Sequence, residues 1–422
     1  MTDSTNNHSE ETKKLSEKEE LRRQGDLVIQ GFKHLADTTN SSLQKDYQRE
    51  RSIAITSVKT KVSVDQPELK KGLLVQLQTS LLPQLQQHVI TISQLTNPSD
   101  LRKEPASSFK RMLEIQSDLT TILDQISHAT DIICSEPLYL SHPSVRRNDQ
   151  YLNELKPYKL QGLHHRLTTF FLQELYNVFD SSYQTIQQLE FSTKKYNDRI
   201  DLTDARDTMI EAVDECLECI ELALDWLKGS EFDNVQEDWR YEKCGINETL
   251  QKVLSLIDPR TCQNKKKHRS KEPLSRPVVK LAKSVVPVIK LCRIFFNKLS
   301  VRGMNRRRLP PFTTMCSYQL EIISALAGHT GAELGGILHV LQEANTTDNE
   351  DTRYALTRAV GALETQFQTP FLLILLHFVP IIPDTDGDPV QDYYKKWFAV
   401  WNTQFNLAII NLLDAIKEYE GN

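Results

Sequence analysis

Two basic clusters in the second half of the chain are the residues best suited to bind a ligand. They consist of Lys265, Lys266, Lys267, Arg269, Lys271, Arg306, Arg307 and Arg308. Grouped Lys and Arg side chains attract the phosphates of nucleic acids and anionic lipids, and short basic runs also serve as nuclear import signals. Neither cluster has interleaved aromatic residues, which would stack on bases. The clusters therefore predict a nuclear-targeting signal, an anion-binding surface or an ordinary solvated loop, and they do not favour sequence-specific binding of nucleic acid.

Cysteine and histidine spacing argues against a metal or redox centre. Cys216 and Cys219 form a Cys-x-x-Cys pair, but a zinc ribbon needs a second such pair. A redox pair would follow a strand, and the surrounding residues predict a helix. Adjacent His164 and His165 point to different faces of a helix, so one helix cannot direct both at one ion. We expect buried free thiols, no metal and no cofactor.

Three acids in the last quarter of the chain, Asp384, Asp386 and Asp388, resemble the start of a calcium loop. The glycine that such a loop requires falls on Pro389, and its bidentate acid falls on Lys395. We interpret the acids as a turn between helices. Because phosphate-cradling glycine loops and nucleophile motifs are also missing from the sequence, we expect the protein not to be an enzyme.

The element best defined by its pattern is a helix that begins at Arg276. Its apolar residues are spaced three and four apart, as in a bundle helix. They are Val278, Leu281, Ala282, Val285, Val288, Ile289, Cys292, Phe295, Phe296 and Leu299. Pro287 falls on the polar strip, where a proline bends a helix around its core. After Pro310 and Pro311 we expect a second helix, capped by Thr313 or Thr314 and running to Leu341.

Glycines at 328, 331, 335 and 336 interrupt this second helix. Small residues at such spacing predict close helix contact, with a ligand loop as the alternative. Further along, Pro370 to Pro383 form the most apolar run of the chain. It is shorter than the ~20 residues that cross a bilayer and contains His377. We predict a buried core helix and no transmembrane segment.

The whole composition favours an all-α protein of 422 residues, with only 14 glycines. Helical patterns with proline kinks recur throughout, and they predict long kinked helices in two packed subdomains. We expect a disordered tail over 1–20, an N-terminal helical bundle over 21–258, a basic linker over 259–275 and a C-terminal helical bundle over 276–422. The first 25 residues are polar, unlike a signal peptide, and the seven cysteines are an odd number. We therefore expect a cytoplasmic or nuclear location.

The formal net charge of −5 hides an uneven distribution. Residues Lys265 to Arg308 hold fifteen Lys or Arg and one acid, whereas Asp201 to Glu248 hold fifteen acids and four bases. Helices of opposite charge can pack side by side, so the ordinary interpretation is complementarity within the molecule on solvated faces.

Several stretches resemble an uncharacterised family of helical proteins from plant-pathogenic rust fungi. They are Leu101–Pro105, Arg302–Pro310, Val379–Gly387, Tyr393–Trp397 and Trp401–Phe405. This resemblance extends from about Leu73 to the C-terminus and implies no known activity.

The order of helices is also distantly similar to the Grap2 and cyclin-D interacting protein family. The likeness covers Leu281–Lys283, the run to Leu299, and a last helix with Trp397 and Ala408–Ile409. That family is all-α, and its members bind and restrain cell-cycle and transcription factors. The resemblance implies a non-enzymatic protein-binding module.

Taken with the absence of a catalytic motif, the pattern predicts a module that holds an amphipathic helix of another protein in a groove between its own helices. The alternative function is binding of nucleic acid or anionic lipid by the basic 265–308 region.

Overall fold

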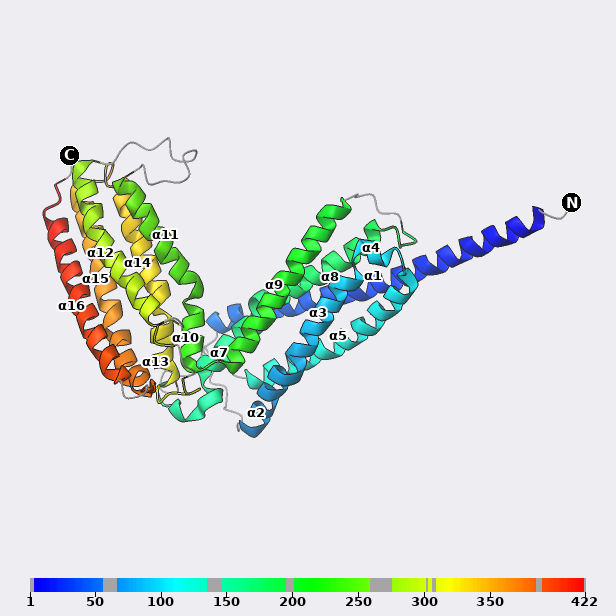
Figure 1. Ribbon diagram of the computed structural model, residues 1–422, viewed down its shortest axis with the longest axis horizontal. Helices are drawn as coiled ribbons and strands as arrows, with labels where there is room; N and C mark the ends of the chain where they lie inside the picture. Colours follow the sequence, from blue (N-terminus) through cyan, green and yellow to red (C-terminus); the bar gives the residue numbers. More distant parts are fainter. Residues whose placement is uncertain are drawn as a thin grey trace. The chain divides into compact units, whose positions relative to one another are not determined.

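The computed structural model describes residues 4–55, 67–134, 146–194, 201–258, 275–300, 303–305, 309–384 and 389–420. These residues form helices and turns and contain no strand, which confirms the predicted all-α class (Figure 1). Contacts divide the chain into two compact units. Unit 1 comprises Met1–His142 and Lys159–Lys228, and unit 2 comprises Pro143–Tyr158 and Gly229–Asn422.

Unit 1 is a bundle in which α1 packs on α5 and α8, α3 packs on α5 and α9, and α8 packs on α9. Its elements are α1 (Ser4–Ile55), α2 (Pro67–Gln76), the π-helical turn η1 (Leu77–Leu81), α3 (Leu82–Leu95), α4 (Pro98–Leu101), α5 (Pro105–Ile133), α7 (Pro157–His165), the π-helical turn η3 (Arg166–Phe170), α8 (Phe171–Gln188) and α9 (Leu202–Lys228). The apolar stripes of α3 and α5 are buried, as their periodicity predicts.

The segment predicted as a disordered tail is partly helical, because α1 begins at Ser4. Residues 15–20 are exposed, so these turns gain nothing from burial. They are rich in Glu and Lys, which are good helix formers and which extend a helix already anchored downstream. The anchor is formed by Val28, Phe32 and Leu35, which are buried.

A π-helical turn precedes two of the prolines. The turn η1 ends two residues before Pro83, and η5 (Ile374–Phe378) ends two residues before Pro380. A proline lacks the N–H that would bond to the carbonyl four residues earlier, and its ring clashes with that carbonyl. A wider turn at this point relieves the clash while the helix continues. At Pro83 the helix therefore accommodates its proline through a π-turn.

Unit 2 is a second bundle in which α12 packs on α11 and α16, and α15 packs on α14 and α16 (Figure 1). Its elements are the 3₁₀ turn η2 (Gln150–Leu155), α10 (Glu231–Asp238), α11 (Arg240–Ile257), α12 (Arg276–Lys298), α13 (Ser317–Ser324), α14 (Leu326–Glu343), α15 (Asn349–Leu373), η5, the 3₁₀ turn η6 (Val379–Ile381) and α16 (Val390–Lys417). Every apolar residue predicted to face the core from α12 is buried, and Pro287 is exposed.

The core of unit 2 is aromatic. The ring centroid of Phe295 lies 4.6 Å from that of Trp401, 5.2 Å from Phe367 and 5.9 Å from Phe398. Trp401 in turn stacks on Phe405 at 4.9 Å with an interplanar angle of 13°. Aromatic pairs at these separations stabilise a core beyond the area they bury. The cluster therefore joins α12, α15 and α16 into one packed layer.

The last change of unit along the chain lies at Gly229, after an earlier excursion of Pro143–Tyr158 into unit 2, whereas the prediction placed one boundary in the basic stretch after 258. Helices α10 and α11 consequently belong to unit 2. The composition of the basic stretch suggested a linker there. However, α11 packs on α12 and α14, so the helix before that stretch belongs to the same unit as the helices after it.

The predicted helix to Leu341 begins later and is broken. Cys316 precedes α13, and its backbone N–H donates to Gln319 Oε1 at 3.0 Å. Thr313, expected as a cap, instead bonds to Glu231 at 2.6 Å. A break at Ala325 separates α13 from α14, and the indole N–H of Trp239 donates to the carbonyls of Ile323 and Ser324 beside it. These carbonyls are the ones a helix end leaves without partners.

Close helix contact at the glycines of α14 is only partly found. A methyl group added at Gly328 or Gly331 would lie at ordinary van der Waals distance from the Glu242 side chain of α11. An added methyl group at Gly335 or Gly336 would meet nothing within 4 Å. The prediction is wrong for this second pair, which faces open space.

The apolar run after Pro370 is buried on one side only. Ile374 and Phe378 lie in the core, in agreement with a core helix, whereas Leu372 and Leu376 are 56% and 67% exposed, so one side of this helix is not buried. By length and composition alone, the continuous helix Asn349–Ile381 could span a membrane, and 33% of its most apolar stretch is buried in the fold. The absence of a transmembrane segment therefore stays a prediction.

Candidate functional site

The basic clusters lie outside the part of the chain that the structure describes. This holds for Lys265, Lys266, Lys267, Arg269, Lys271, Arg306, Arg307 and Arg308. Asp386 and Asp388 of the acidic turn also lie outside it. Their roles as targeting signal, anion-binding surface or solvated loop therefore stay predictions.

A buried polar network holds the start of α10 in unit 2. Lys156 Nζ lies 2.6 Å from Glu231 Oε1 and donates to the Thr313 carbonyl at 3.0 Å. Glu231 Oε2 accepts from both the backbone N–H and the hydroxyl of Thr313, at 2.8 and 2.6 Å. Lys156 and Glu231 are 0% and 1% exposed, so no substrate reaches them. The network fixes the loop before α13 against α10 and has no accessible reactive group.

The two closely spaced thiols, Cys216 and Cys219, lie on α9 of unit 1. Cys216 is fully buried and Cys219 half-buried, and both are free. Burial raises the pKa of both thiols, that of Cys219 to about 11 with help from the Glu174 carboxylate. Among the residues described, no three His, Cys, Asp or Glu side chains group as metal ligands. These thiols have the features expected of core residues.

Unit 2 does present one extended surface feature, along the antiparallel pair α12 and α16. The pairing is fixed at three levels: Lys280 to Glu418 at 3.2 Å, the Leu291 carbonyl to Trp401 Nε1 at 2.9 Å, and Lys298 Nζ to Tyr393 Oη at 2.7 Å. The α12 residues therefore run past α16 in reverse order.

Large apolar side chains are exposed along this pair. Tyr393, Val400 and Leu407 of α16 are 53%, 62% and 49% exposed. Ile294 of α12 is 47% exposed and lies between the levels of Leu291 and Lys298, opposite the stretch that contains Trp397 and Val400. We call Ile294, Tyr393, Trp397, Val400 and Leu407 the α12–α16 seam.

The sequence prediction missed this seam. The apolar spacing of the last helix predicts that Trp397 and Ala415 face inward together with Trp401, Phe405, Ala408 and Leu412. The last four are buried, but Trp397 and Ala415 are only half-buried. The core face of α16 instead includes Tyr394 and Phe398. A signal was present, because a second apolar row recurs every seven residues at 393, 400 and 407 and one face of a helix cannot bury both rows.

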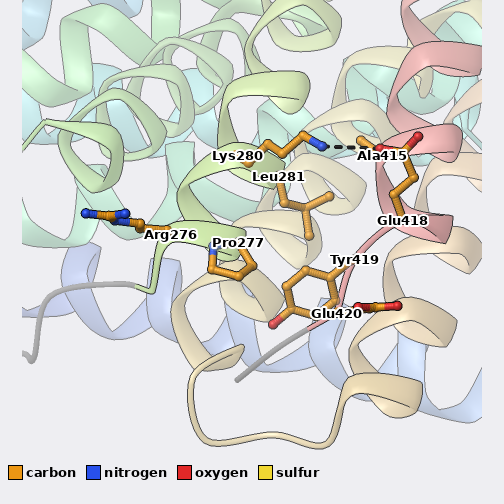
Figure 2. Close-up of a pocket in the computed structure, with 8 residues that line it drawn as sticks. All are labelled: Arg276, Pro277, Lys280, Leu281, Ala415, Glu418, Tyr419 and Glu420. Atoms are coloured by element: carbon orange, nitrogen blue, oxygen red, sulfur yellow. Dashed lines mark hydrogen bonds and ion pairs between the residues drawn. The ribbon is translucent and has the colours of Figure 1, made fainter.

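A surface hollow of about 310 Å³ lies at the far end of the same helix pair. Figure 2 shows Leu281 and Tyr419 within it and Lys280 reaching across to Glu418. Pro277 and Ala415 complete its apolar lining, with Arg276 and Glu420 at its edge. Burial raises the pKa of Tyr419, so its hydroxyl stays protonated and donates to the Ala344 carbonyl at 3.2 Å. The hollow suits an apolar side chain better than chemistry.

Positive charge surrounds the middle of the seam. Helix α12 carries Arg276, Lys280, Lys283, Lys290, Arg293 and Lys298 and no acid. On α16, Lys395 is paired with Asp392 at 3.3 Å, and Lys396 adds a further cation with no acid between Tyr393 and Leu413. Lys298 Nζ lies 4.4 Å from the ring centroid of Tyr393 and 5.2 Å from that of Trp397, so one end of the seam is a cation held on aromatic faces.

The fold and this surface define an all-α protein of two helical units with an exposed apolar seam on the second. Residues 230–414 match a family model described as "Domain of unknown function (DUF8721)", and residues 70–228 match one described as "Domain of unknown function (DUF8723)". The two matches meet at the boundary between the units. No curated protein and no solved structure matches the chain.

Proposed function

We propose that this chain is a non-enzymatic protein-protein interaction module and that it holds a helix of its partner against the α12–α16 seam. One observation carries the proposal: Tyr393, Val400 and Leu407 stand about half exposed on a helix whose opposite face is fully packed. Exposed apolar side chains that line up on one surface are typical of interaction sites. An amphipathic helix that lies in the groove between two neighbouring helices is a common way to cover such a row.

The family resemblance supports the same proposal. Similarity to the Grap2 and cyclin-D interacting protein family favours a partner that regulates the cell cycle or transcription. The odd number of cysteines favours the cytosol or nucleus as its location.

Affinity capture with the full chain tests the proposal. We would compare the wild type with Val400→Asp and with a matched control, Val75→Asp on α2. Val75 is 57% exposed, close to the 62% of Val400, but lies in unit 1. We expect captured proteins that are lost with Val400→Asp and kept with Val75→Asp. Capture that is equal for both variants, or small-molecule turnover without a protein partner, would refute the proposal.

The alternative function, binding of nucleic acid or anionic lipid, also has a supporting observation. Helix α12 lies within the 265–308 region and carries six cations without an acid. Counterion release would make such binding fall steeply with salt. Titration of duplex DNA and of phosphatidylserine vesicles at two salt concentrations, with Lys265, Lys266 and Lys267 changed to Ala, distinguishes this function. Absent or salt-insensitive binding would remove it.

A further inference from the structure

We infer that the α12–α16 seam selects an acidic amphipathic helix. This inference rests on the proposed function and adds to it the charge and the repeat of the partner. It follows from three features of unit 2: the seven-residue spacing of the exposed row, the one-sided charge beside it, and the hollow at its end.

The spacing of the exposed row sets the repeat of the partner. Tyr393, Val400 and Leu407 are seven residues apart, so they recur about every 10 Å along one line of α16. A partner helix with apolar residues in a seven-residue repeat stays in register with such a line. Ile294 widens the row on the α12 side at the level where Trp397 and Val400 lie. The row therefore fits a helix of about three turns or more.

The positive charge beside the exposed row favours negative charge on the partner helix. Lys290 is four residues before Ile294 on α12, and Lys396 is four before Val400 on α16, so each stands one helical turn from a seam residue. Lys283 lies seven residues before Lys290 and extends the same side. All three are exposed. Acids at the flanking positions of a docked helix would face these cations, and such rim pairs determine partner choice and association rate.

The preference for acids is confined to the middle of the seam. At the end with the hollow, Glu418 and Glu420 stand beside Arg276 and Lys280, and Lys280 is paired with Glu418 at 3.2 Å (Figure 2). This end is mixed in charge and apolar in its lining, with Pro277, Leu281 and Ala415. It can accept one apolar side chain from the end of the partner helix.

A protein helix fits these features better than a membrane or a nucleic acid. Gln404 and Asn411 continue the exposed side of α16 between and beyond the apolar residues, and a helix that lies in a bilayer surface needs a continuous apolar face. Nucleic acid would neutralise the lysines but leave Val400 and Leu407 uncovered. Paired apolar and acidic groups on one helix satisfy both sets of residues.

A selection from displayed peptides tests the inference without assuming one sequence. The library holds helices of about three heptads with Leu at the repeat positions and Glu, Lys or Gln at random elsewhere. We would select against the full chain and score the charge at the positions flanking the repeat. We expect enrichment of Glu, and binding by the selected peptides that falls about tenfold or more with Val400→Asp and is unchanged with Val75→Asp.

A charge reversal supplies the second arm. Lys290→Glu should weaken a selected Glu-rich peptide several-fold and restore binding to its Lys-rich counterpart, with a larger effect at low salt. The matched control is Arg358→Glu on α15, which is also an exposed cation in unit 2. Equal effects of both reversals, no enrichment of Glu, or no selected binder would each overturn the inference.

The outcomes separate this inference from the proposed function. Binders that need Val400 but show no charge preference leave the interaction module standing and refute the acidic partner. Binding of phosphatidylserine vesicles or duplex DNA that is lost with Val400→Asp, with no peptide selected, assigns the seam to that other ligand and refutes both. Loss of seam-dependent peptides and of seam-dependent capture together refutes both as well.

Discussion

Lys156 Nζ and Glu231 Oε1 lie 2.6 Å apart with both side chains shut off from solvent. The two residues are 75 positions apart in the chain, and the pair fastens the segment before α7 to the first turn of α10. Thr313 completes the arrangement, because its carbonyl accepts from Lys156 while its N–H and hydroxyl donate to Glu231. A buried ion pair of this kind is tolerated only when its remaining hydrogen-bonding groups are also satisfied.

Lys156→Met should destabilise unit 2 by about 3–5 kcal/mol, because it leaves the Glu231 carboxylate buried without its cation. Glu231→Gln keeps the acceptor for Thr313 and removes the charge. The double variant should therefore be more stable than Lys156→Met alone. Chemical denaturation followed by circular dichroism measures each change.

The control is Lys252→Met. Lys252 is an exposed cation of α11 that pairs with Glu248 at 3.5 Å, so its replacement should cost little stability. Equal costs for Lys156→Met and Lys252→Met would contradict the role of the pair.

No local signal in the sequence predicts this pair. In the sequence, Glu231 is one of many acids in an acidic block, and Lys and Glu side chains are rarely buried. The burial of Lys156 and Glu231 depends on Thr313, which the local sequence predicts to be a helix cap. Periodicity did predict the core helices, because a helix that buries one face has an apolar residue every three or four positions. It could not predict contacts between residues distant in the chain, because such contacts produce no periodic pattern.

Gly162 of α7 is required by the close approach of Trp226. A methyl group at this position would overlap the indole ring. That ring is fixed on other sides, since its N–H donates to the Lys159 carbonyl at 2.8 Å and the Arg166 guanidinium lies 3.7 Å from its centroid. Gly162→Ala should therefore destabilise unit 1 by about 1–3 kcal/mol despite the better helix propensity of alanine.

Gly72 provides the matched control for this substitution. It also lies within a helix of unit 1, but an added methyl group meets nothing within 4 Å. Gly72→Ala should stabilise the helix by about 0.5–1 kcal/mol. Thermal unfolding of the two variants should shift in opposite directions. A shift in the same direction would show that the Trp226 contact can relax.

The α16 helix shows where periodicity becomes ambiguous. Apolar residues occupy two rows, so either row satisfies a helical repeat. The aromatic partners on α12 and α15 choose between them: Phe295 and Phe367 both contact Trp401, which fixes the row with Phe405 inward. Tyr393, Val400 and Leu407 are then left outside. The candidate site thus arises from a choice between rows that only tertiary packing makes.

The thiols should react in an order set by burial. Cys244 is exposed, whereas burial raises the pKa of Cys219 to about 11, and neighbouring Glu174, Glu218 and Glu215 add to the effect. At neutral pH only about one Cys219 side chain in ten thousand is then a thiolate. Iodoacetamide should label Cys244 first and Cys219 slowly, at a rate that rises with pH toward 11. Cys216 and Cys292, both fully buried, should react only on unfolding. Peptide mass spectrometry follows the labelling, and Cys219 reacting as fast as Cys244 would point to a redox site.

The protonation of His377, near the buried Lys156–Glu231 pair, should make the stability of unit 2 depend on pH. Burial lowers the pKa of its imidazole below the usual 6.5, and the positive charge of Lys156 lowers it further. Its Nδ1 lies 3.0 Å from the Thr314 hydroxyl, which can donate to the neutral ring. The unfolded chain therefore binds this proton more readily than the folded one, so the stability of unit 2 should fall as the pH drops below 6.5. His377→Gln should reduce that fall.

An NMR titration of the His377 ring protons measures the pKa directly. Removal of the Lys156 charge alone, in Lys156→Met, should move the pKa of His377 upward, because one of its two causes is gone. The same titration of His88 provides a control: burial lowers its pKa too, but no Lys156 effect acts on it, so Lys156→Met should leave it unchanged. A His377 that titrates at its usual value in the wild type, or that does not respond to Lys156→Met, would show that Lys156 does not act on it.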